Sequence, residues 1–235
     1  MKKRWKIFLF IGIILTLLVL IARLTGILGL YNVSSAGNQP AINPGDKMIT
    51  TKLIHPKKFE LAMFRNTISE IYLNESWVFR LMAEEGDTIE MIHGDCFVNS
   101  RFVDNKINRK LSYKISHNDL RKYNQKLKEG RLTNGNLEQQ VFDMQSDSVM
   151  VTLDESLVRE FHFQYFKRYE KPFIQSPEYP TWVGGLNWTP SHFGPYIIPL
   201  NHVFVMGDNR DNANDSRFLG PIKKRDVEGT VIKIY

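Results

Sequence analysis

Hydrophobic and polar positions divide the chain into one long apolar segment followed by short alternating segments. The apolar segment is IFLFIGIILTLLVLIA, residues 7–22, and LTGILGLY follows after Arg23. The charge-free part is slightly short for a bilayer, but Arg23 stands near its end and its head group can extend to the interface. Trp5 and Tyr31 would lie near the two interfaces. The pattern predicts a transmembrane anchor over residues 7–30.

The residues that flank this anchor predict its orientation. The basic N-terminus, residues 1–6 (MKKRWK), favours a cytoplasmic location and leaves residues 32–235 outside the cytoplasm. A cleavable signal peptide is the alternative, because Ser34-Ser35-Ala36 offers small residues. That site lies about fourteen residues past the main apolar run, which is long for cleavage. Because no second apolar run of spanning length follows, we expect an uncleaved, single-pass protein of the cell membrane.

The rest of the chain has the pattern of strands and turns. SWVFRLMA (76–83) alternates, and GDTIEMI and CFVNSRFV follow it with turn signals between them. HVFVMGD (202–208) is a short apolar strand that precedes a polar loop, and GTVIKIY closes the chain as another strand. The predicted fold class is therefore mainly β, with one preceding transmembrane helix.

Two other segments depart from the strand pattern. One helix is predicted over HNDLRKYNQKLKE, with Ser116 as its cap, Asp119 at the third position and Gly130 at its end. Residues 171–195 are rich in Pro, Gly and Trp, which predicts a long ordered loop packed by its aromatic side chains.

Length and composition narrow the function. A chain of 235 residues can hold an anchor and one core of moderate size. The net charge of +6 comes without a nucleic-acid-binding motif or a long basic stripe, so no nucleic acid partner is expected. The single cysteine, Cys96, excludes an intrachain disulfide and is expected to pack as a small apolar side chain.

The most informative polar stretch is GDNRDNANDSRFLG, residues 207–220. Its Asp spacing partly resembles a calcium loop. An EF-hand loop that began at Asp208 would need Gly at its sixth position and Glu at its twelfth, where this chain has Ala213 and Leu219. Two arginines within the loop also disfavour a cation, so neither a metal nor another cofactor is expected.

This stretch strongly resembles the C-terminal signature of bacterial type I signal peptidases, membrane-anchored serine endopeptidases that remove signal peptides from exported preproteins. VSSAGNQPAINPGDKMI, WVFRLMAEEGDTIEM, CFVNSRFV and FGPYIIP resemble further segments of that family in the same order. The resemblance implies a β-rich extracytoplasmic domain with an inserted cap. Its core lobe would combine residues 32–105 and 195–235, and residues 106–194 would form the cap lobe.

The family mechanism uses a serine nucleophile and a lysine base, with a second serine that orients the lysine and a third that binds the oxyanion. Aligned on the motifs, the nucleophile position is Gly37, the general-base position is Phe79 and the lysine-orienting position is Ala213. Ser35 remains at the oxyanion position. The resemblance therefore identifies this chain as a member that lacks the catalytic dyad, and whether it is an enzyme stays open.

The framework of the family signature is retained around these changes. By resemblance, Arg80 would pair with Asp208, and Asp215 with Arg217, which fixes loop geometry without bond-breaking chemistry. The retained motif residues are Pro40, Gly45, Asp46, Arg80, Gly86, Asp87, Gly207, Asp208, Asn209, Asp215, Ser216 and Arg217.

Two functions follow from the substitutions. The first is a non-catalytic protein of the signal peptide processing pathway that binds signal peptides or assists an active signal peptidase, with membrane lipid around its anchor. An extended substrate that adds as a strand needs no nucleophile, although Phe79 could instead close the cleft.

The second function is an active signal peptidase with a displaced nucleophile, Ser34 or Ser35. Ser35 lies two residues from the family position, a shift of roughly 7 Å along an extended chain. A lysine or histidine would have to reach the serine, and no motif links a histidine to either one. The six candidates are His55, His93, His117, His162, His192 and His202.

Overall fold

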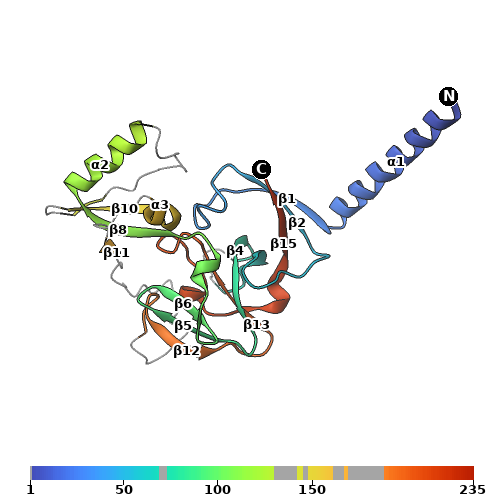
Figure 1. Cartoon of the computed structure of the whole chain (residues 1–235). Helices are drawn as coiled ribbons and strands as arrows, with labels where there is room; N and C mark the ends of the chain where they lie inside the picture. Colours follow the sequence, from blue (N-terminus) through green and yellow to red (C-terminus); the bar gives the residue numbers. More distant parts are fainter. Residues whose placement is uncertain (1, 69–72, 130–141, 145–147, 161–166, 169–187) are drawn as a thin grey trace.

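The structure is a computed structural model that describes residues 2–68, 73–129, 142–144, 148–160, 167–168 and 188–235. One long helix projects from a β-rich body that contains three sheets (Figure 1). The mainly β fold predicted from the alternating segments is confirmed.

Helix α1 (Lys2–Leu24) is the apolar segment. Its stretch Arg4–Leu24 is long and apolar enough to cross a membrane, with a mean hydropathy of 2.8, and none of it is buried in the body. The helix ends where Gly26 adopts a left-handed φ of +70° and donates its N–H to the Arg23 carbonyl at 3.1 Å.

The anchor predicted over 7–30 extends past this helix. Residues 28–30 belong instead to strand β1 (Leu28–Asn32), which pairs with β2 (Lys47–Thr51). The apolar run continues through LGLY because β1 is partly buried, so hydropathy alone could not separate the helix from the strand.

The largest sheet has seven strands in the order β1-β2-β15-β3-β4-β13-β14. Its C-terminal strand β15 pairs antiparallel with both β2 and β3, so the two ends of the body lie side by side (Figure 1). Besides β1 and β2, the strands are β3 (Leu61–Arg65), β4 (Ser76–Glu84), β13 (His202–Met206), β14 (Ile222–Lys223) and β15 (Val227–Ile234).

A second sheet has the order β12-β5-β6-β7. It packs against the largest sheet through a core in which Ile89, Phe193 and Phe204 are almost fully buried. Cys96 lies in this core as a free, fully buried thiol, as predicted. The strands are β5 (Thr88–Ile92), β6 (Asp95–Val98), β7 (Arg101–Phe102) and β12 (Phe193–Ile197), and a 3₁₀ turn, η1 (Asp104–Lys106), follows β7.

The third sheet, in the order β11-β8-β10-β9, lies on the side of the body opposite α1, with α2 beside it (Figure 1). It has its own core around Tyr113, Tyr123 and Val151. Its elements are β8 (Lys110–Ser116), α2 (His117–Lys128), β9 (Phe142–Met144), β10 (Ser148–Asp154), α3 (Glu155–Glu160) and β11 (Lys167–Arg168).

Helix α2 confirms the predicted cap. The Ser116 hydroxyl accepts the Asp119 N–H at 3.0 Å and donates to the Asp119 carboxylate at 2.7 Å. The predicted end at Gly130, and residues 171–187 of the predicted aromatic loop, lie outside the described residues. The predicted boundaries of the core and cap lobes stay a prediction.

Candidate functional site

The three positions that the family resemblance aligns with catalytic groups converge on one cleft. Gly37 comes from the loop before β2, Phe79 from β4, and Ala213 from the loop after β13, and all three line a cavity of about 390 Å³. Ser35 lines the same cavity. The four positions that the resemblance matched to the catalytic machinery are therefore neighbours in space.

Phe79 occupies the space in front of position 37. A Cβ on Gly37 would lie 3.3 Å from Phe79 Cε1 and 3.4 Å from Ser35 Oγ. Phe79 is 7% exposed, and its ring packs against Phe64 and Trp77 at centroid distances of 5.8 and 6.1 Å. An apolar ring edge therefore lies where a nucleophile at 37 would meet its base.

The Ser35 side chain is hydrogen-bonded to the backbone of Gly37, the residue at the nucleophile position. Its Oγ accepts the Gly37 N–H at 3.1 Å. No lysine or histidine is among the described residues that line the cleft. Ser35 can still donate its hydroxyl proton, but the described lining offers it neither a lysine nor a histidine as a base.

Ala213 reaches the cleft because the signature loop docks directly on the segment at Gly37. The Asn209 N–H donates to the Gly37 carbonyl at 3.0 Å, and Asn209 Nδ2 donates to the Ala36 carbonyl at 3.1 Å. A Cβ on Gly207 would overlap both the Ala213 methyl group and the Gly37 carbonyl. Glycine at 207 therefore permits the close approach of the two loops.

The two ion pairs expected from the resemblance are present. Arg80 Nε donates to Asp208 Oδ1 at 2.7 Å, a second nitrogen of the same guanidinium binds Oδ2, and a third donates to the Phe59 carbonyl. The Asp208 side chain is 1% exposed and that of Arg80 is 14% exposed. This bidentate pair joins β4 to the loop after β13.

The second pair lies within the signature loop itself. Asp215 caps helix α4 (Ser216–Leu219) and accepts the N–H of Arg217 at 3.1 Å and of Gly207 at 2.8 Å, together with the Arg217 Nε at 2.8 Å. The Ser216 hydroxyl accepts the Val205 N–H at 3.1 Å. These bonds stabilise the loop that carries Ala213.

The remaining motif residues shape turns next to the cleft strands. Gly45 and Gly86 have φ of +94° and +81°, in the left-handed region that favours glycine. Asp46 accepts the Asn43 N–H at 2.8 Å, and Asp87 accepts the Glu84 N–H at 2.9 Å. Pro40 follows Gln39 through a cis peptide bond.

The surroundings of Asp87 shift the pKa of its carboxyl group. Burial by itself would raise the pKa of this carboxyl. Hydrogen bonds from the Glu84 N–H, Asn99 and Lys58 outweigh burial, so the pKa of Asp87 lies below its ordinary value.

Sequence reasoning missed a buried charge network next to the signature loop. Arg210 is 2% exposed and donates two hydrogen bonds to Asp104, which is fully buried and also pairs with Arg109. Arg109 extends the network to Glu155 at 2.7 Å. Burial by itself lowers the pKa of Arg109, but Glu155 and Asp104 raise it above the ordinary value, so the guanidinium stays charged.

Lys110 connects the third sheet to the cleft loop and was also missed. Lys110 is only 4% exposed, and its Nζ donates to Gln39 Oε1 at 3.0 Å. Burial raises the pKa of Asp154, and the charge of Lys110 partly offsets that rise. Lys110 and Asp154 lie outside the segments that resemble the family, so no motif pointed to them.

Five of the six candidate histidines are described, and none of the five lines the cleft. His55 lines a different pocket, the rings of His93 and His192 face each other at 5.6 Å, and His202 contacts the Leu200 carbonyl at 2.8 Å. His117 begins α2, and His162 lies outside the described residues. Within the described ranges, no group of three His, Cys, Asp or Glu side chains could hold a metal ion.

The family model for signal peptidase, peptidase S26, matches residues 4–235. The chain belongs to this family. Membership supports a role in signal peptide processing, and together with α1 it is consistent with a membrane-anchored protein.

Known family members are similar to this chain at low to moderate identity. Signal peptidase I of Aquifex aeolicus is 25% identical over 218 residues, which covers 87% of this chain and 74% of that protein. Signal peptidase I S of Bacillus subtilis is 37% identical over 65 residues, or 27% of this chain and 35% of that protein. A crystal structure of a signal peptidase I from Enterococcus faecalis aligns with a TM-score of 0.34 at 17% identity, covering 76% of this chain and 98% of that chain.

Proposed function

We propose that this chain is a non-catalytic member of the signal peptidase family that binds extended polypeptide segments, signal peptides among them, in the cleft at Gly37. The observation that carries the non-catalytic part is the position of Phe79. Its ring edge lies 3.3 Å from where a Cβ on Gly37 would be, so neither a nucleophile nor a base occupies the centre of the cleft. Losing one member of a nucleophile–base pair already removes almost as much turnover as losing both, so a chain that lacks both is expected to be inactive.

The unpaired side of β4 supports peptide binding. Strand β4 pairs with β3 from Ser76 to Arg80, whereas β13 pairs with it only from Arg80 onward. Among the described residues, the stretch 76–79 of β4 therefore has a neighbouring strand on one side only. The Val78 carbonyl on the open side accepts the side-chain amide of Asn38. An extended peptide can add along this edge by backbone hydrogen bonds.

The cleft lining favours an uncharged occupant. Met48, Val78 and Ala213 contribute apolar surface, and Glu75 is the one charged side chain among the described lining residues. This chemistry suits an extended segment with small or apolar side chains. It also disfavours the active alternative, because Ser35 would need a lysine or histidine beside it.

The proposed membrane topology follows from the basic residues at the N-terminal end of α1. The basic residues near the N-terminus favour the cytoplasm, so the body with its cleft faces the outside of the membrane in a single-pass arrangement. An active signal peptidase is the second partner that this location allows. Such a complex would be detected by crosslinking at the cleft.

Preprotein cleavage and peptide binding together test the proposal. The full-length protein in lipid or detergent is compared with Ser35→Ala and with the triple variant Gly37→Ser, Phe79→Lys, Ala213→Ser. We expect no cleavage by the unmodified protein and cleavage at the signal-peptide junction by the triple variant. Cleavage by the unmodified protein that Ser35→Ala abolishes would overturn the non-catalytic function.

Binding is measured with a fluorescent signal peptide. Ala213→Trp places a large side chain in the cleft, and Leu200→Trp places the same side chain at a site that is 76% exposed outside it. We expect Ala213→Trp to weaken binding at least about tenfold and Leu200→Trp to leave it unchanged. Equal affinities for both variants would exclude the cleft as the binding site.

A further inference from the structure

The side chain of Asn38 brings an unpaired oxygen to the cleft. Asn38 lines the cleft and is only 6% exposed. Its Nδ2 donates to the Val78 carbonyl, whereas its Oδ1 is buried and has no partner among the described residues. Buried polar atoms nearly always have a partner, because leaving one unpaired costs free energy. The Asn38 oxygen is therefore placed to accept from a group that occupies the cleft.

Asn214 adds a second such oxygen from a different segment of the chain. It follows Ala213 in the signature loop and also lines the cleft. Its Oδ1 is buried and, like that of Asn38, finds no donor within the described part of the chain. The loop before β2 and the loop after β13 thus each contribute one unpaired acceptor to the same cavity.

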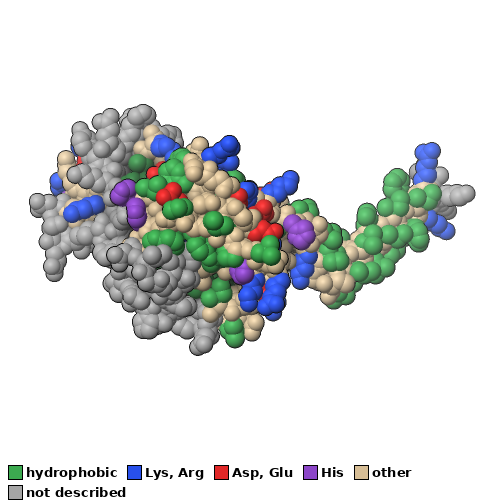
Figure 2. Space-filling view, turned by 90° about the horizontal axis from the view of Figure 1, so that it is seen from below, with side chains coloured by type: hydrophobic (Ala, Val, Ile, Leu, Met, Phe, Trp, Pro, Cys, Tyr) green, Lys and Arg blue, Asp and Glu red, His purple; other side chains and the backbone are tan. Residues whose placement is uncertain are grey.

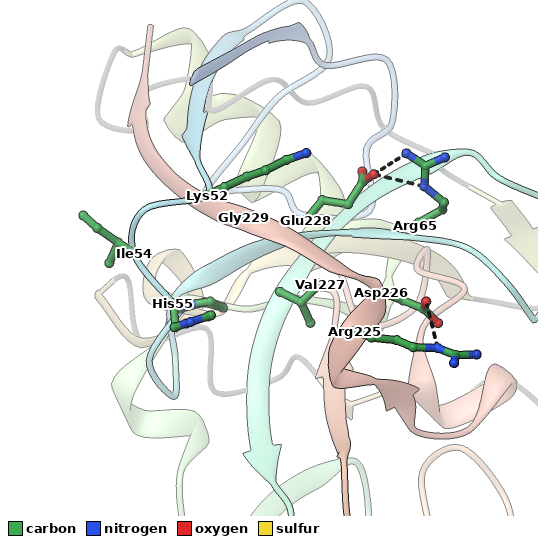
Figure 3. Close-up of a pocket in the computed structure, with 10 residues that line it drawn as sticks. Lys52, Ile54, His55, Arg65, Arg225, Asp226, Val227, Glu228 and Gly229 are labelled. Atoms are coloured by element: carbon green, nitrogen blue, oxygen red, sulfur yellow. Dashed lines mark hydrogen bonds and ion pairs between the residues drawn. The ribbon is translucent and has the colours of Figure 1, made fainter. Parts of the chain in front are cut away.

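Two donors of the cleft lining are already engaged. The Ser76 hydroxyl donates to the Glu228 carboxylate at 2.7 Å. Glu228 belongs to a separate pocket of about 260 Å³, where it also pairs with Arg65 (Figure 3). The Trp77 indole N–H donates to Glu75 at 3.3 Å. Neither donor is available to the two asparagine oxygens.

Charged side chains are scarce in the cleft. Lys, Arg, Asp and Glu side chains stand on the outer surface of the body, as the face in Figure 2 shows. Among the described lining residues, Glu75 is the one charged side chain, and it is exposed. An ammonium or guanidinium of an occupant would lose water beside Phe79 and Ile42 without a buried carboxylate of the described lining to pair with. An uncharged donor reaches the two oxygens at a lower cost.

The Asn38 carboxamide also connects an occupant to strand β4. The Val78 carbonyl lies on the open side of β4, where an added strand would use it as an acceptor. Asn38 Nδ2 already donates to this carbonyl. An occupant at this point therefore meets the Asn38 oxygen, and through the same carboxamide it is bonded to the edge of the sheet.

We propose that Asn38 and Asn214 are specificity residues, and that the cleft selects a polypeptide segment with a serine, threonine or amide side chain at the residue seated against them. The inference rests on the peptide binding in the proposed function and narrows its substrate class. Backbone N–H groups are common to all segments, so they add affinity without selection. A hydroxyl or amide side chain donates to the oxygens, whereas an apolar side chain of the same size leaves them unpaired.

Fluorescent signal peptides that differ by one hydroxyl test the selection. Each residue near the cleavage junction of the peptide is replaced in turn by threonine and by valine, which have nearly the same shape, and binding to the full-length protein in detergent is measured by anisotropy. We expect the threonine peptide to bind at least about tenfold more tightly than the valine peptide at one position. Equal affinities at every position would overturn the selection and leave peptide binding intact. Absence of binding for every peptide would overturn the proposed function as well.

Asn38→Leu and Asn214→Leu identify the acceptors. Each variant removes one oxygen and keeps a side chain of similar size, and Asn105→Leu makes the same change at an exposed position of η1, away from the cleft lining. We expect the threonine-to-valine affinity ratio to fall at least about threefold in each cleft variant and to stay unchanged in Asn105→Leu.

The ratio compares two peptides on one protein sample, so it does not depend on the folded fraction of a variant. If Asn38→Leu fails to fold because its bond to Val78 is lost, Asn214→Leu still measures the contribution of the second oxygen. A ratio that the folded cleft variants retain would overturn the assignment of the acceptors.

Discussion

The edge of the Phe79 ring lies against the space that a side chain on Gly37 would fill. A Cβ at 37 would stand 3.3 Å from Phe79 Cε1, closer than most such contacts in folded proteins. The two substitutions are therefore coupled in space, because the small residue at one position accommodates the large ring at the other.

This coupling predicts that Gly37→Ser alone is destabilising and inactive. The added side chain has to push against a ring that is itself held by Phe64 and Trp77, at a cost of about 1 kcal/mol or more in the free energy of unfolding. Urea unfolding in detergent measures the cost, and preprotein cleavage measures activity. A single variant that cleaves would show that a base is available from elsewhere in the chain.

Phe79→Lys alone should be more damaging than Phe79→Leu. A lysine at this position would bring an ammonium into the cluster that Phe79 forms with Phe64 and Trp77, and the loss of the ring alone costs about 3 kcal/mol or more. The leucine variant keeps an apolar side chain and separates the loss of packing from the burial of charge. Unfolding free energies of the two variants give the comparison, and similar values would mean that water reaches the lysine.

Arg80→Ala should cost about 3–5 kcal/mol in the free energy of unfolding, because it leaves the buried Asp208 carboxylate without its partner. Arg65→Ala is the matched control, since Arg65 pairs with Glu228 but its side chain is 51% exposed, and its removal should cost far less than that of Arg80 because solvent screens the pair. Urea unfolding distinguishes the two, and equal costs would contradict a structural role for the buried pair.

The pKa of Asp87 predicts a pH dependence of stability. Because its pKa in the folded protein lies below the ordinary value, the stabilisation from this carboxylate is fully present above the unfolded pKa of about 3.9. It is lost as the pH falls through the lower folded value. Unfolding free energies from neutral to acidic pH, compared between the unmodified protein and Asp87→Asn, should converge in that acidic window. A difference that does not change with pH would contradict the prediction.

The pattern of the sequence predicted local elements well. Alternation identified β4, a short apolar run before a polar loop identified β13, and the Ser116 cap identified the start of α2, because each depends on neighbouring residues. The pairing of β15 between β2 and β3 joins segments from opposite ends of the chain, so no local pattern contains it.

In the candidate site, too, residues within local motifs were predicted and contacts between distant segments were not. Gly37, Phe79 and Ala213 were located because motif residues flank each of them. Asp104 and Arg210 were missed because their contact joins positions 106 residues apart, and one of them lies outside every motif. Charged residues that become buried in pairs look like surface residues in the sequence.

The short connection between α1 and β1 limits how far the cleft can lie from the membrane. From Leu24 to Ser35 the chain has eleven steps, which span about 40 Å at the most when fully extended. If α1 spans the membrane and the cleft binds extended segments, as proposed above, the cleft works at a bounded height above the bilayer. It would then engage a polypeptide only where an unfolded stretch emerges within that height, so a polypeptide that folds right at the membrane surface would stay out of its reach.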